Sequence, residues 1–333
     1  MNSDKRHRML GALPALGLAA GICGAHPHGE QWALANEYPA TSLTAEGDAF
    51  FAQSVADATR GKLTIVALPD AKLGYKSREQ LKAVAEGKVA MADSFGGALG
   101  DEHPLFGLSS LPFVVNGIGE ARALYTAARP AYDRAFAQHN QKLLYATPWP
   151  PTGLWSKRQA TSIEAVGKLR IRTYDKTGTE LFGRMAAAAG VVSFADLPPK
   201  LAAGEIDAVL SSGDGGAGRK LWDALPHFSE INYAIPLSFA TVNLDKWRKL
   251  DAPTRKAVES AAAATEARQW VAVERRVFEN YQRMRANDMS IHPADEIDAN
   301  LVAKMREAGR AAVDEWAARA GPESRALLER AGK

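Results

Sequence analysis

The chain has 333 residues, of which 46% are hydrophobic and 24% charged, and its formal net charge is +3. This composition is typical of a globular protein, and the length predicts two domains that can each bury a full core. The near balance of charge excludes a broad basic face for nucleic acid, and the single cysteine, Cys23, excludes a disulfide framework.

The first 25 residues have the pattern of a secretory signal peptide. Basic side chains at positions 5, 6 and 8 precede the apolar run Met9–Ile22, and small residues lead to Ala25, where we expect cleavage. Cys23 leaves a lipoprotein signal as an alternative, although Ile22 is larger than the residue that such a signal favours. Without this segment, 38 basic and 37 acidic side chains remain of the 41 and 38 in the whole chain. We therefore expect a near-neutral periplasmic product.

The first half of the remaining chain alternates between predicted strands and helices. Period-two patterns indicate strands, apolar residues at helical spacing indicate helices, and glycines such as Gly61 and Gly87 mark helix ends. Ser77 and Gln80 have the spacing of a capping box, and Pro130 predicts a break within its helix. The expected segments are the strand Gln31–Asn36, the helix Ala45–Arg60, the strand Lys62–Leu68, the helix Ser77–Glu86, the strand Lys88–Asp93, the apolar loop Leu105–Val115, the helix Ile118–Gln138, the strand Lys142–Thr147 and the aromatic crossover Trp149–Trp155.

The second half continues in the same way, and then becomes helical. One uninterrupted helical pattern from Trp247 to about Asp288 is too long for a single small lobe, so we expect a helix or a kinked pair of helices that spans both. The other expected segments are a strand within Gly167–Asp175, the helix Thr177–Ala189, the strand Val191–Phe194, the helix Leu197–Ala203, the strand Glu205–Leu210 and a helix over Glu296–Lys333.

A weak internal repeat relates the two halves of the chain. The segment Gly61–Ile65 resembles Gly167–Ile171, and Glu86–Ala90 resembles Ala203–Asp207. Two similar β-α-β halves predict two α/β lobes with parallel-type sheets. Ligands bind such sheets at the carboxyl ends of the strands, so the sequence predicts a crevice between the lobes.

Arg172 is the strongest candidate for contact with a ligand. Leu169, Ile171 and Thr173 alternate with Arg170 and Arg172, which is the pattern of a strand with one apolar face. A guanidinium near the carboxyl end of a strand offers two parallel hydrogen bonds to a carboxylate. The alternative is a sheet-edge strand with two solvated arginines, and Arg170 has no further argument in favour of a binding role.

The segment Gly213–Gly218 fits the pattern G-x-G-x-x-G and supports a weak alternative, an NAD-binding oxidoreductase. The pattern is more often a turn or hinge, and Pro226–Pro236 does not form a clean strand that ends in an acid. The histidines form no H-E-x-x-H motif, and the sequence has no G-x-S-x-G motif. We therefore expect no catalytic residue, no cofactor and no metal.

From about residue 31 to 320, the chain resembles the extracytoplasmic solute receptors of tripartite ATP-independent periplasmic (TRAP) transporters. The segment Gly167–Arg172 is the most specific piece of this resemblance. The other pieces are the strand that begins after Gly61, Glu86–Val89, Leu111–Phe113, Ala203–Asp207 and the long C-terminal helix.

This resemblance implies an α/β fold of the two-lobed periplasmic-binding-protein type, with a ligand cleft between the lobes and a long helix that spans both. It implies that Arg172 holds the carboxylate of a small organic acid, with Tyr174 and Asp175 beside it. The partners that it implies are the membrane permease subunits of a TRAP transporter. We expect lobe I in residues 31–148 plus 238–275 and lobe II in 149–237 plus 276–330.

Two departures from the family pattern bear on the ligand. Many members carry a second arginine after the glycine that corresponds to Gly153, where this chain has Leu154, Trp155 and Ser156. Many also have a Gly-Gln-Glu-Asn-like stretch where this chain has Leu210–Asp214. The loss of these polar partners disfavours a dicarboxylate or sialic acid, and a nearby indole favours a monocarboxylate with an apolar or aromatic body.

The expected function is the capture of such a monocarboxylate by hinge closure, without catalysis, and its delivery to the permease. A periplasmic ligand-sensing or scaffold component remains the alternative from another class. Further residues are placed in the cleft by predicted strand ends or crossovers. They are Trp149, Trp155, Phe95, Ser94, Ser211, Ser212 and Phe239.

Overall fold

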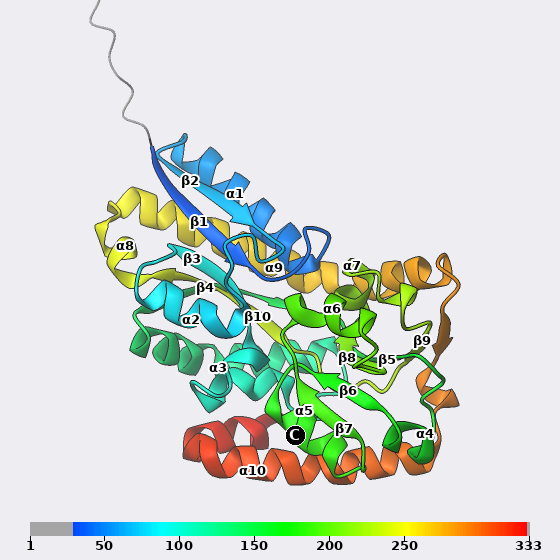
Figure 1. Ribbon diagram of the computed structural model, residues 1–333. Coiled ribbons are helices and arrows are strands. Elements are labelled where there is room, and N and C mark those ends of the chain that lie inside the picture. Colours follow the sequence, from blue (N-terminus) through cyan, green and yellow to red (C-terminus); the bar gives the residue numbers. More distant parts are fainter. Residues whose placement is uncertain (1–28, 332–333) are drawn as a thin grey trace, which may run out of the picture.

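The computed structural model describes residues 29–331, so the expected signal peptide lies outside the described residues. Two separate sheets organise the chain, and each forms the centre of one lobe (Figure 1). No helix within the described residues is both long enough and apolar enough to cross a membrane.

Lobe I contains a five-stranded sheet with mixed strand directions. β1 pairs in parallel with β2 and β3, whereas β10 returns from the second half of the chain and pairs antiparallel with β3 and β4. In sheet order the strands are β2 (Leu63–Leu68), β1 (Glu30–Asn36), β3 (Met91–Phe95), β10 (Leu237–Asn243) and β4 (Gln141–Pro148). Its helices are α1 (Leu43–Thr59), α2 (Ser77–Ala85), η1 (Gly96–Leu99), η2 (Pro104–Ser110), α3 (Ile118–Gln138) and α8 (Leu244–Lys249).

Lobe II contains a six-stranded sheet in which β6 lies between β7 and β8, parallel to both. In sheet order the strands are β11 (Ser290–His292), β9 (His227–Ser229), β5 (Thr152–Ser156), β8 (Ala208–Ser212), β6 (Arg170–Thr173) and β7 (Ala188–Val191). Its helical segments are α4 (Ile163–Gly167), α5 (Lys176–Gly183), η3 (Phe194–Asp196), α6 (Leu197–Ala202), α7 (Gly213–Gly218), η4 (Leu221–Asp223) and η5 (Ala294–Glu296).

Two long helices connect the lobes along opposite sides of the molecule (Figure 1). α9 (Ala252–Arg285) packs on α1 and β4 of lobe I and on α7 and β11 of lobe II. α10 (Ala299–Ala331) runs along the other side, against α5 of lobe II and α3 and η2 of lobe I. The prediction of a long helix that spans both lobes is confirmed.

The sequence erred at several element boundaries. Of the two forms expected for Trp247–Asp288, a single helix and a pair, the structure has a pair, because Asp251 caps α9 by accepting a 2.7 Å hydrogen bond from the Thr254 N–H. The expected break at Pro130 does not occur, because α3 packs in the core on both sides of the proline and this burial offsets its cost. The capping box is one residue earlier than expected, with Glu79 accepting a 3.0 Å hydrogen bond from the Lys76 N–H.

The region between β6 and α6 also differs from the sequence prediction. α5 ends at Gly183, so the last residues of the expected helix Thr177–Ala189 form the start of β7. The expected strand Val191–Phe194 has only its first residue in β7, and Phe194 begins η3 instead. Ala186 breaks the helix because it adopts a positive φ of 62° between these elements.

Candidate functional site

Arg172 lies on β6 and lines a small cavity between the lobes. The residue is only 3% exposed. Its Nε donates a 2.8 Å hydrogen bond to the Val192 carbonyl, and its Nη1 donates a 3.0 Å hydrogen bond to the Leu210 carbonyl. These bonds to the flanking strands fix the guanidinium in place, while Nη2 makes no hydrogen bond within residues 29–331.

The buried Arg172 guanidinium has no carboxylate within ion-pair distance among the described residues. Burial lowers the pKa of Arg172, although Tyr38 and Glu37 act in the opposite direction from further away. A buried charge without a partner is costly in free energy, so this site is suited to an anion. Arg172 differs in this respect from Arg170, which lies at the surface and binds both carboxylate oxygens of Asp207.

Aromatic rings from both lobes surround Arg172. The ring centroid of Tyr38 lies 4.5 Å from that of Trp149 and 4.8 Å from that of Phe194. Phe95 of lobe I meets Tyr174 of lobe II edge to face at 5.0 Å. The guanidinium carbon of Arg172 is 5.8 Å from the Phe194 centroid, which is within reach of a cation–π contact. The site therefore combines one cation with mostly apolar walls.

The cavity beside Arg172 has a volume of about 20 Å³. This is room for about one water molecule, so a ligand requires the lobes or the rings to move apart. The cavity is lined by Tyr38, Phe95, Trp149, Thr152, Arg172, Tyr174, Phe194, Ser211, Ser212, Gly215 and Pro236.

Strand ends explain why these side chains meet. Phe95 is the last residue of β3, and Ser211 and Ser212 are the last residues of β8. Tyr38 follows the end of β1, and Tyr174 follows the end of β6. The parallel strands of both lobes thus direct their carboxyl ends to the same crevice, as in other open α/β sheets.

Six of the candidate residues from the sequence line this cavity, namely Arg172, Trp149, Tyr174, Ser211, Ser212 and Phe95. Sequence reasoning missed Tyr38, Thr152 and Phe194. The position of Tyr38 just after the first predicted strand could have identified it, because strand ends are where ligands bind. Phe194 was the last residue of the expected strand Val191–Phe194, so the same rule could have identified it, although in the structure it begins η3.

Four candidate residues lie elsewhere. Trp155 is fully buried beneath the site and donates a 3.2 Å hydrogen bond from Nε1 to the Ser212 carbonyl. Ser94 donates a hydrogen bond to Gln80 within lobe I, and Phe239 packs on Tyr132. Asp175 caps α5 by accepting a 2.8 Å hydrogen bond from the Gly178 N–H, and burial raises its pKa to about 7.

The glycine-rich segment that suggested a dinucleotide site is itself the short helix α7. A Cβ on Gly216 would lie 2.1 Å from the Trp155 indole, so this glycine allows α7 to pack on the ring. The carboxylate of Asp214 accepts hydrogen bonds from the Leu43 N–H of lobe I and from Arg276 and Asn280 of α9. The segment therefore serves to join the lobes to α9.

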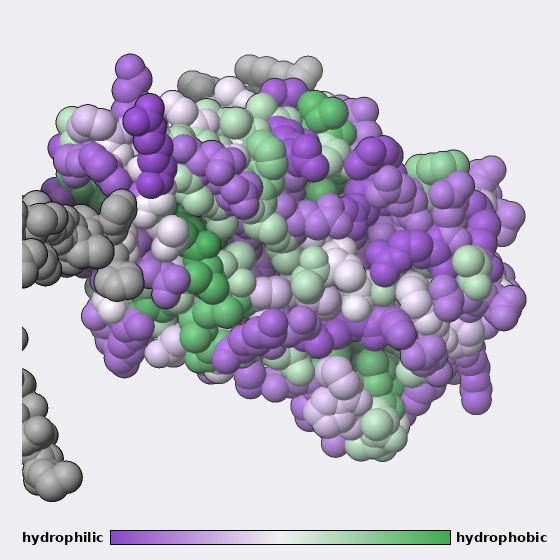
Figure 2. Space-filling model, turned by 90° about the horizontal axis from the view of Figure 1, so that it is seen from above, coloured by the Kyte–Doolittle hydropathy of each residue, from purple (hydrophilic) through white to green (hydrophobic). Residues whose placement is uncertain are grey.

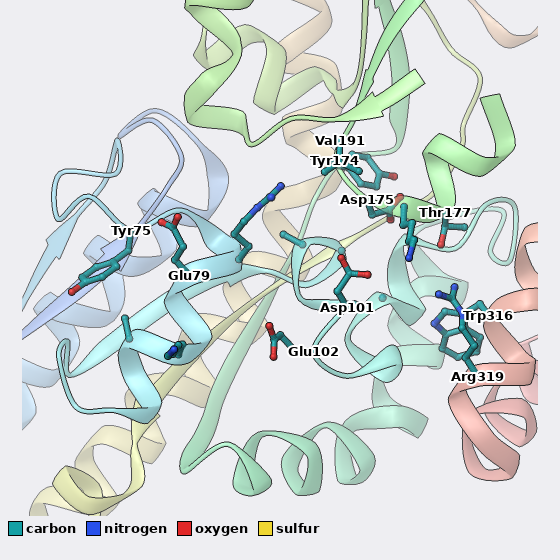
Figure 3. Close-up of a pocket in the computed structure, with 18 of the residues that line it drawn as sticks. Tyr75, Glu79, Asp101, Glu102, Tyr174, Asp175, Thr177, Val191, Trp316 and Arg319 are labelled. Atoms are coloured by element: carbon teal, nitrogen blue, oxygen red, sulfur yellow. The ribbon is translucent and has the colours of Figure 1, made fainter. Parts of the chain in front are cut away.

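A larger cavity of about 750 Å³ opens on the other side of Tyr174 and Asp175. Figure 3 shows Tyr75 and Glu79 on one side of it, Trp316 and Arg319 on the other, and Asp101 and Glu102 between them. Its charged side chains are of both signs, and some are already paired, as Glu86 is with Lys82 and Lys88. This cavity lacks the buried, unpartnered charge that distinguishes the site at Arg172.

Hydrogen bonds and an ion pair hold the lobes together beside the Arg172 site. Glu37 of lobe I accepts a 2.9 Å hydrogen bond from the Ala195 N–H of lobe II. Next to it, the Lys76 ammonium lies 2.8 Å from Asp196. These contacts join the two lobes beside the cavity.

A family sequence model, "Bacterial extracellular solute-binding protein, family 7", matches residues 34–319, which is most of the chain. The chain belongs to this family. Solved structures of TRAP extracytoplasmic solute receptors match the fold closely, so the protein is a TRAP solute receptor with the two-lobed periplasmic-binding-protein fold. The resemblance seen in the sequence is confirmed.

Three receptors with solved structures share more than a quarter of their residues with this TRAP receptor. DctP7 of Bordetella pertussis, which binds pyroglutamic acid, is 28% identical, with 91% of this chain and 99% of that chain covered and a TM-score of 0.87. DctP6 of the same organism, also a pyroglutamic acid receptor, is 27% identical. The match covers 91% of this chain and 99% of DctP6, with a TM-score of 0.85. A marine metagenome receptor specific for pyroglutamate is 26% identical. The match covers 92% of this chain and 99% of that receptor, with a TM-score of 0.86. No curated protein matches the chain.

Proposed function

We propose that this TRAP receptor works in the periplasm, where it captures a small organic monocarboxylate by hinge closure and passes it to the membrane permease subunits. The observation that carries this proposal is the Arg172 guanidinium, which is buried and has no carboxylate partner among the described residues. A ligand carboxylate would supply the missing charge through Nη2. The family and the signal-peptide pattern of residues 1–25 support the location.

The lining of the cavity supports a single carboxylate. Within the described residues, Arg172 is the one cation that lines it, and aromatic side chains form much of the remainder. A second carboxylate would be buried there without a charged partner, which is unfavourable. Because three receptors above 25% identity bind pyroglutamate, that compact monocarboxylate is the first candidate ligand.

The test compares Arg172→Ala with Arg170→Ala by calorimetric titration of pyroglutamate and a panel of other small monocarboxylates. Arg172→Ala should weaken binding at least about 100-fold, because the carboxylate loses its buried partner. Arg170→Ala is the matched control: it removes an arginine from the same strand, and its affinity should equal that of the parent protein. Circular dichroism checks that both variants fold. Unchanged affinity in Arg172→Ala, or binding of neutral sugars but no acid, would refute the proposal.

A further inference from the structure

Two hydroxyl groups in the wall of the Arg172 cavity lie near each other and have no other hydrogen-bond partner. Thr152 is 1% exposed and Tyr174 is 6% exposed, and both line the cavity. The Thr152 hydroxyl lies close enough to that of Tyr174 to affect its pKa, but neither group has a further partner within residues 29–331. Because nearly all buried polar groups in proteins are hydrogen-bonded, two such groups together indicate recognition of a ligand.

The surrounding structure holds the Thr152 backbone and the Tyr174 ring in place. The backbone of Thr152 makes a 2.9 Å hydrogen bond from its N–H to Ala234, and its carbonyl accepts another of 2.9 Å from the Tyr233 N–H. The ring of Tyr174 packs edge to face on Phe95 at 5.0 Å and on Tyr233 at 6.2 Å. Both residues are therefore positioned at the wall of the cavity by contacts that do not use their hydroxyls.

The chemistry of the two hydroxyls is neutral. Burial raises the pKa of Tyr174 well above its usual range, and the nearby Thr152 hydroxyl acts weakly in the other direction. Tyr174 is therefore an uncharged phenol at physiological pH. A hydroxyl can both donate and accept a hydrogen bond, so the pair suits a neutral polar group such as an amide, carbonyl or hydroxyl.

Arg172 lies on β6, Tyr174 directly follows that strand, and both side chains line the same cavity. Two residues of chain span at most about 6.6 Å. A single compact ligand can therefore reach the guanidinium and the hydroxyls together.

We propose that the ligand carries, beside the carboxylate held by Arg172, an uncharged hydrogen-bonding group that Thr152 and Tyr174 recognise. This inference rests on the proposed function and narrows it, because an acid with a wholly apolar body would bury both hydroxyls and leave their remaining hydrogen-bonding capacity unused, which is unfavourable. The site thus selects small acids with a polar ring or chain atom.

The experiment uses matched pairs of acids that differ in this neutral group. Pyroglutamate is compared with cyclopentanecarboxylate, and lactate with propionate, by calorimetric titration. For at least one pair the parent protein should bind the polar member at least about 100-fold more tightly, because sites built to hydrogen-bond a group reject analogues that lack it. Thr152→Val and Tyr174→Phe each remove a single hydroxyl, and each should reduce that preference by about tenfold or more.

The outcomes distinguish this inference from the proposal that Arg172 binds the ligand carboxylate. Recognition by the hydroxyls is wrong if the apolar acid of each pair binds as tightly as its polar partner. It is also wrong if both variants weaken the binding of the polar and the apolar acid equally. In both cases the proposed role of Arg172 is unaffected. If Arg172→Ala binds every acid as tightly as the parent does, the proposed role of Arg172 is wrong. If no acid of either pair binds but a dicarboxylate does, both are wrong. The inference is supported if both variants lose much of the preference for the polar acid while their affinity for the apolar acid stays that of the parent.

Discussion

The carboxylate of Glu37 bridges the two lobes through the backbone N–H of Ala195. Its Oε1 accepts a 2.9 Å hydrogen bond from Ala195 of lobe II, and its Oε2 accepts another of 2.9 Å from the Ser77 N–H of lobe I. Ala195 belongs to the short segment 192–196, whose Val192 carbonyl accepts the hydrogen bond from Arg172. The contact that closes the lobes and the residue that we propose to hold the ligand are therefore joined by one short stretch of chain.

Glu37→Gln should favour the open form of the receptor. The variant replaces one carboxylate oxygen with an NH₂ group, which cannot accept a hydrogen bond. The Ala195 bond is therefore either lost or made to a neutral acceptor, and it is weaker in both cases. Since a hydrogen bond to a charged group contributes about 1.5–3 kcal/mol, we expect the Kd for pyroglutamate to rise about tenfold or more. Calorimetric titration measures the affinity, and small-angle scattering of the ligand-free protein should show a larger radius of gyration.

Glu79→Gln is the control for this variant. Glu79 also accepts a hydrogen bond from a backbone N–H, that of Lys76, but the bond lies wholly within lobe I at the start of α2. Its affinity and its radius of gyration should match those of the parent protein. A Glu37→Gln protein that stays as compact as the parent and binds as tightly would show that this bridge does not hold the lobes closed.

The sequence could predict the parts of the site that depend on local patterns. Strand alternation around Arg172 and the family motif were enough to single it out, and the repeat of the two halves predicted an interlobe crevice. The contact between Tyr38 and Phe194 was missed because these residues belong to different lobes and lie 156 positions apart, a pairing that no local pattern records. Trp155 was placed in the cleft because it lies in the predicted aromatic crossover, but strand alternation on β5 directs it beneath the site instead.

Gly216→Ala should destabilise the protein. The added Cβ would lie 2.1 Å from the Trp155 ring, far inside contact distance, so α7 or the buried indole would have to shift. Overpacking of this kind typically costs about 1–3 kcal/mol. Gly183→Ala is the control, because no atom lies within 4 Å of a Cβ at that position, and its stability should equal or slightly exceed that of the parent. Urea unfolding measures both; equal stabilities for the two variants would contradict the close packing described here.

Trp149 should report ligand binding through its fluorescence. Its indole lines the cavity, lies 4.5 Å from the Tyr38 ring and donates a 3.0 Å hydrogen bond to the Ser238 hydroxyl. Because a ligand at Arg172 would change the surroundings of this ring, titration with pyroglutamate should alter the intrinsic emission. Trp149→Phe should remove most of that change, whereas Trp247→Phe, in α8 and away from the cavity, should preserve it. An emission change that survives in Trp149→Phe would locate the ligand elsewhere.

A pair of buried carboxyl groups lies in the core of lobe I. Asp48 is fully buried and accepts hydrogen bonds of 2.7 Å from Asn36 and 2.7 Å from Tyr145. Burial raises the pKa of Asp48 to about 6. Burial also raises the pKa of Asp93 well above its usual range, and the charge of Asp48 raises it further. The native state therefore binds protons here that the unfolded chain releases near pH 4.

This pair should make the protein less stable as the pH rises. Between the unfolded pKa near 4 and the native value of about 6 for Asp48, the native state holds more protons than the unfolded state, so the free energy of unfolding falls with increasing pH. Asp93→Asn replaces one acid by an amide that stays neutral and can donate a hydrogen bond to Asp48. The stability of this variant should therefore depend less on pH than that of the parent. At pH 7 its free energy of unfolding should exceed that of the parent by on the order of 2 kcal/mol. The measurement is urea unfolding of the parent and the variant at pH 4, 5, 6 and 7. Asp175 also has a raised pKa, but it is present in both proteins, so the difference between their stabilities reports only the Asp48–Asp93 pair. A difference that stays constant across this range would mean that the two carboxyl groups do not share a titrating proton.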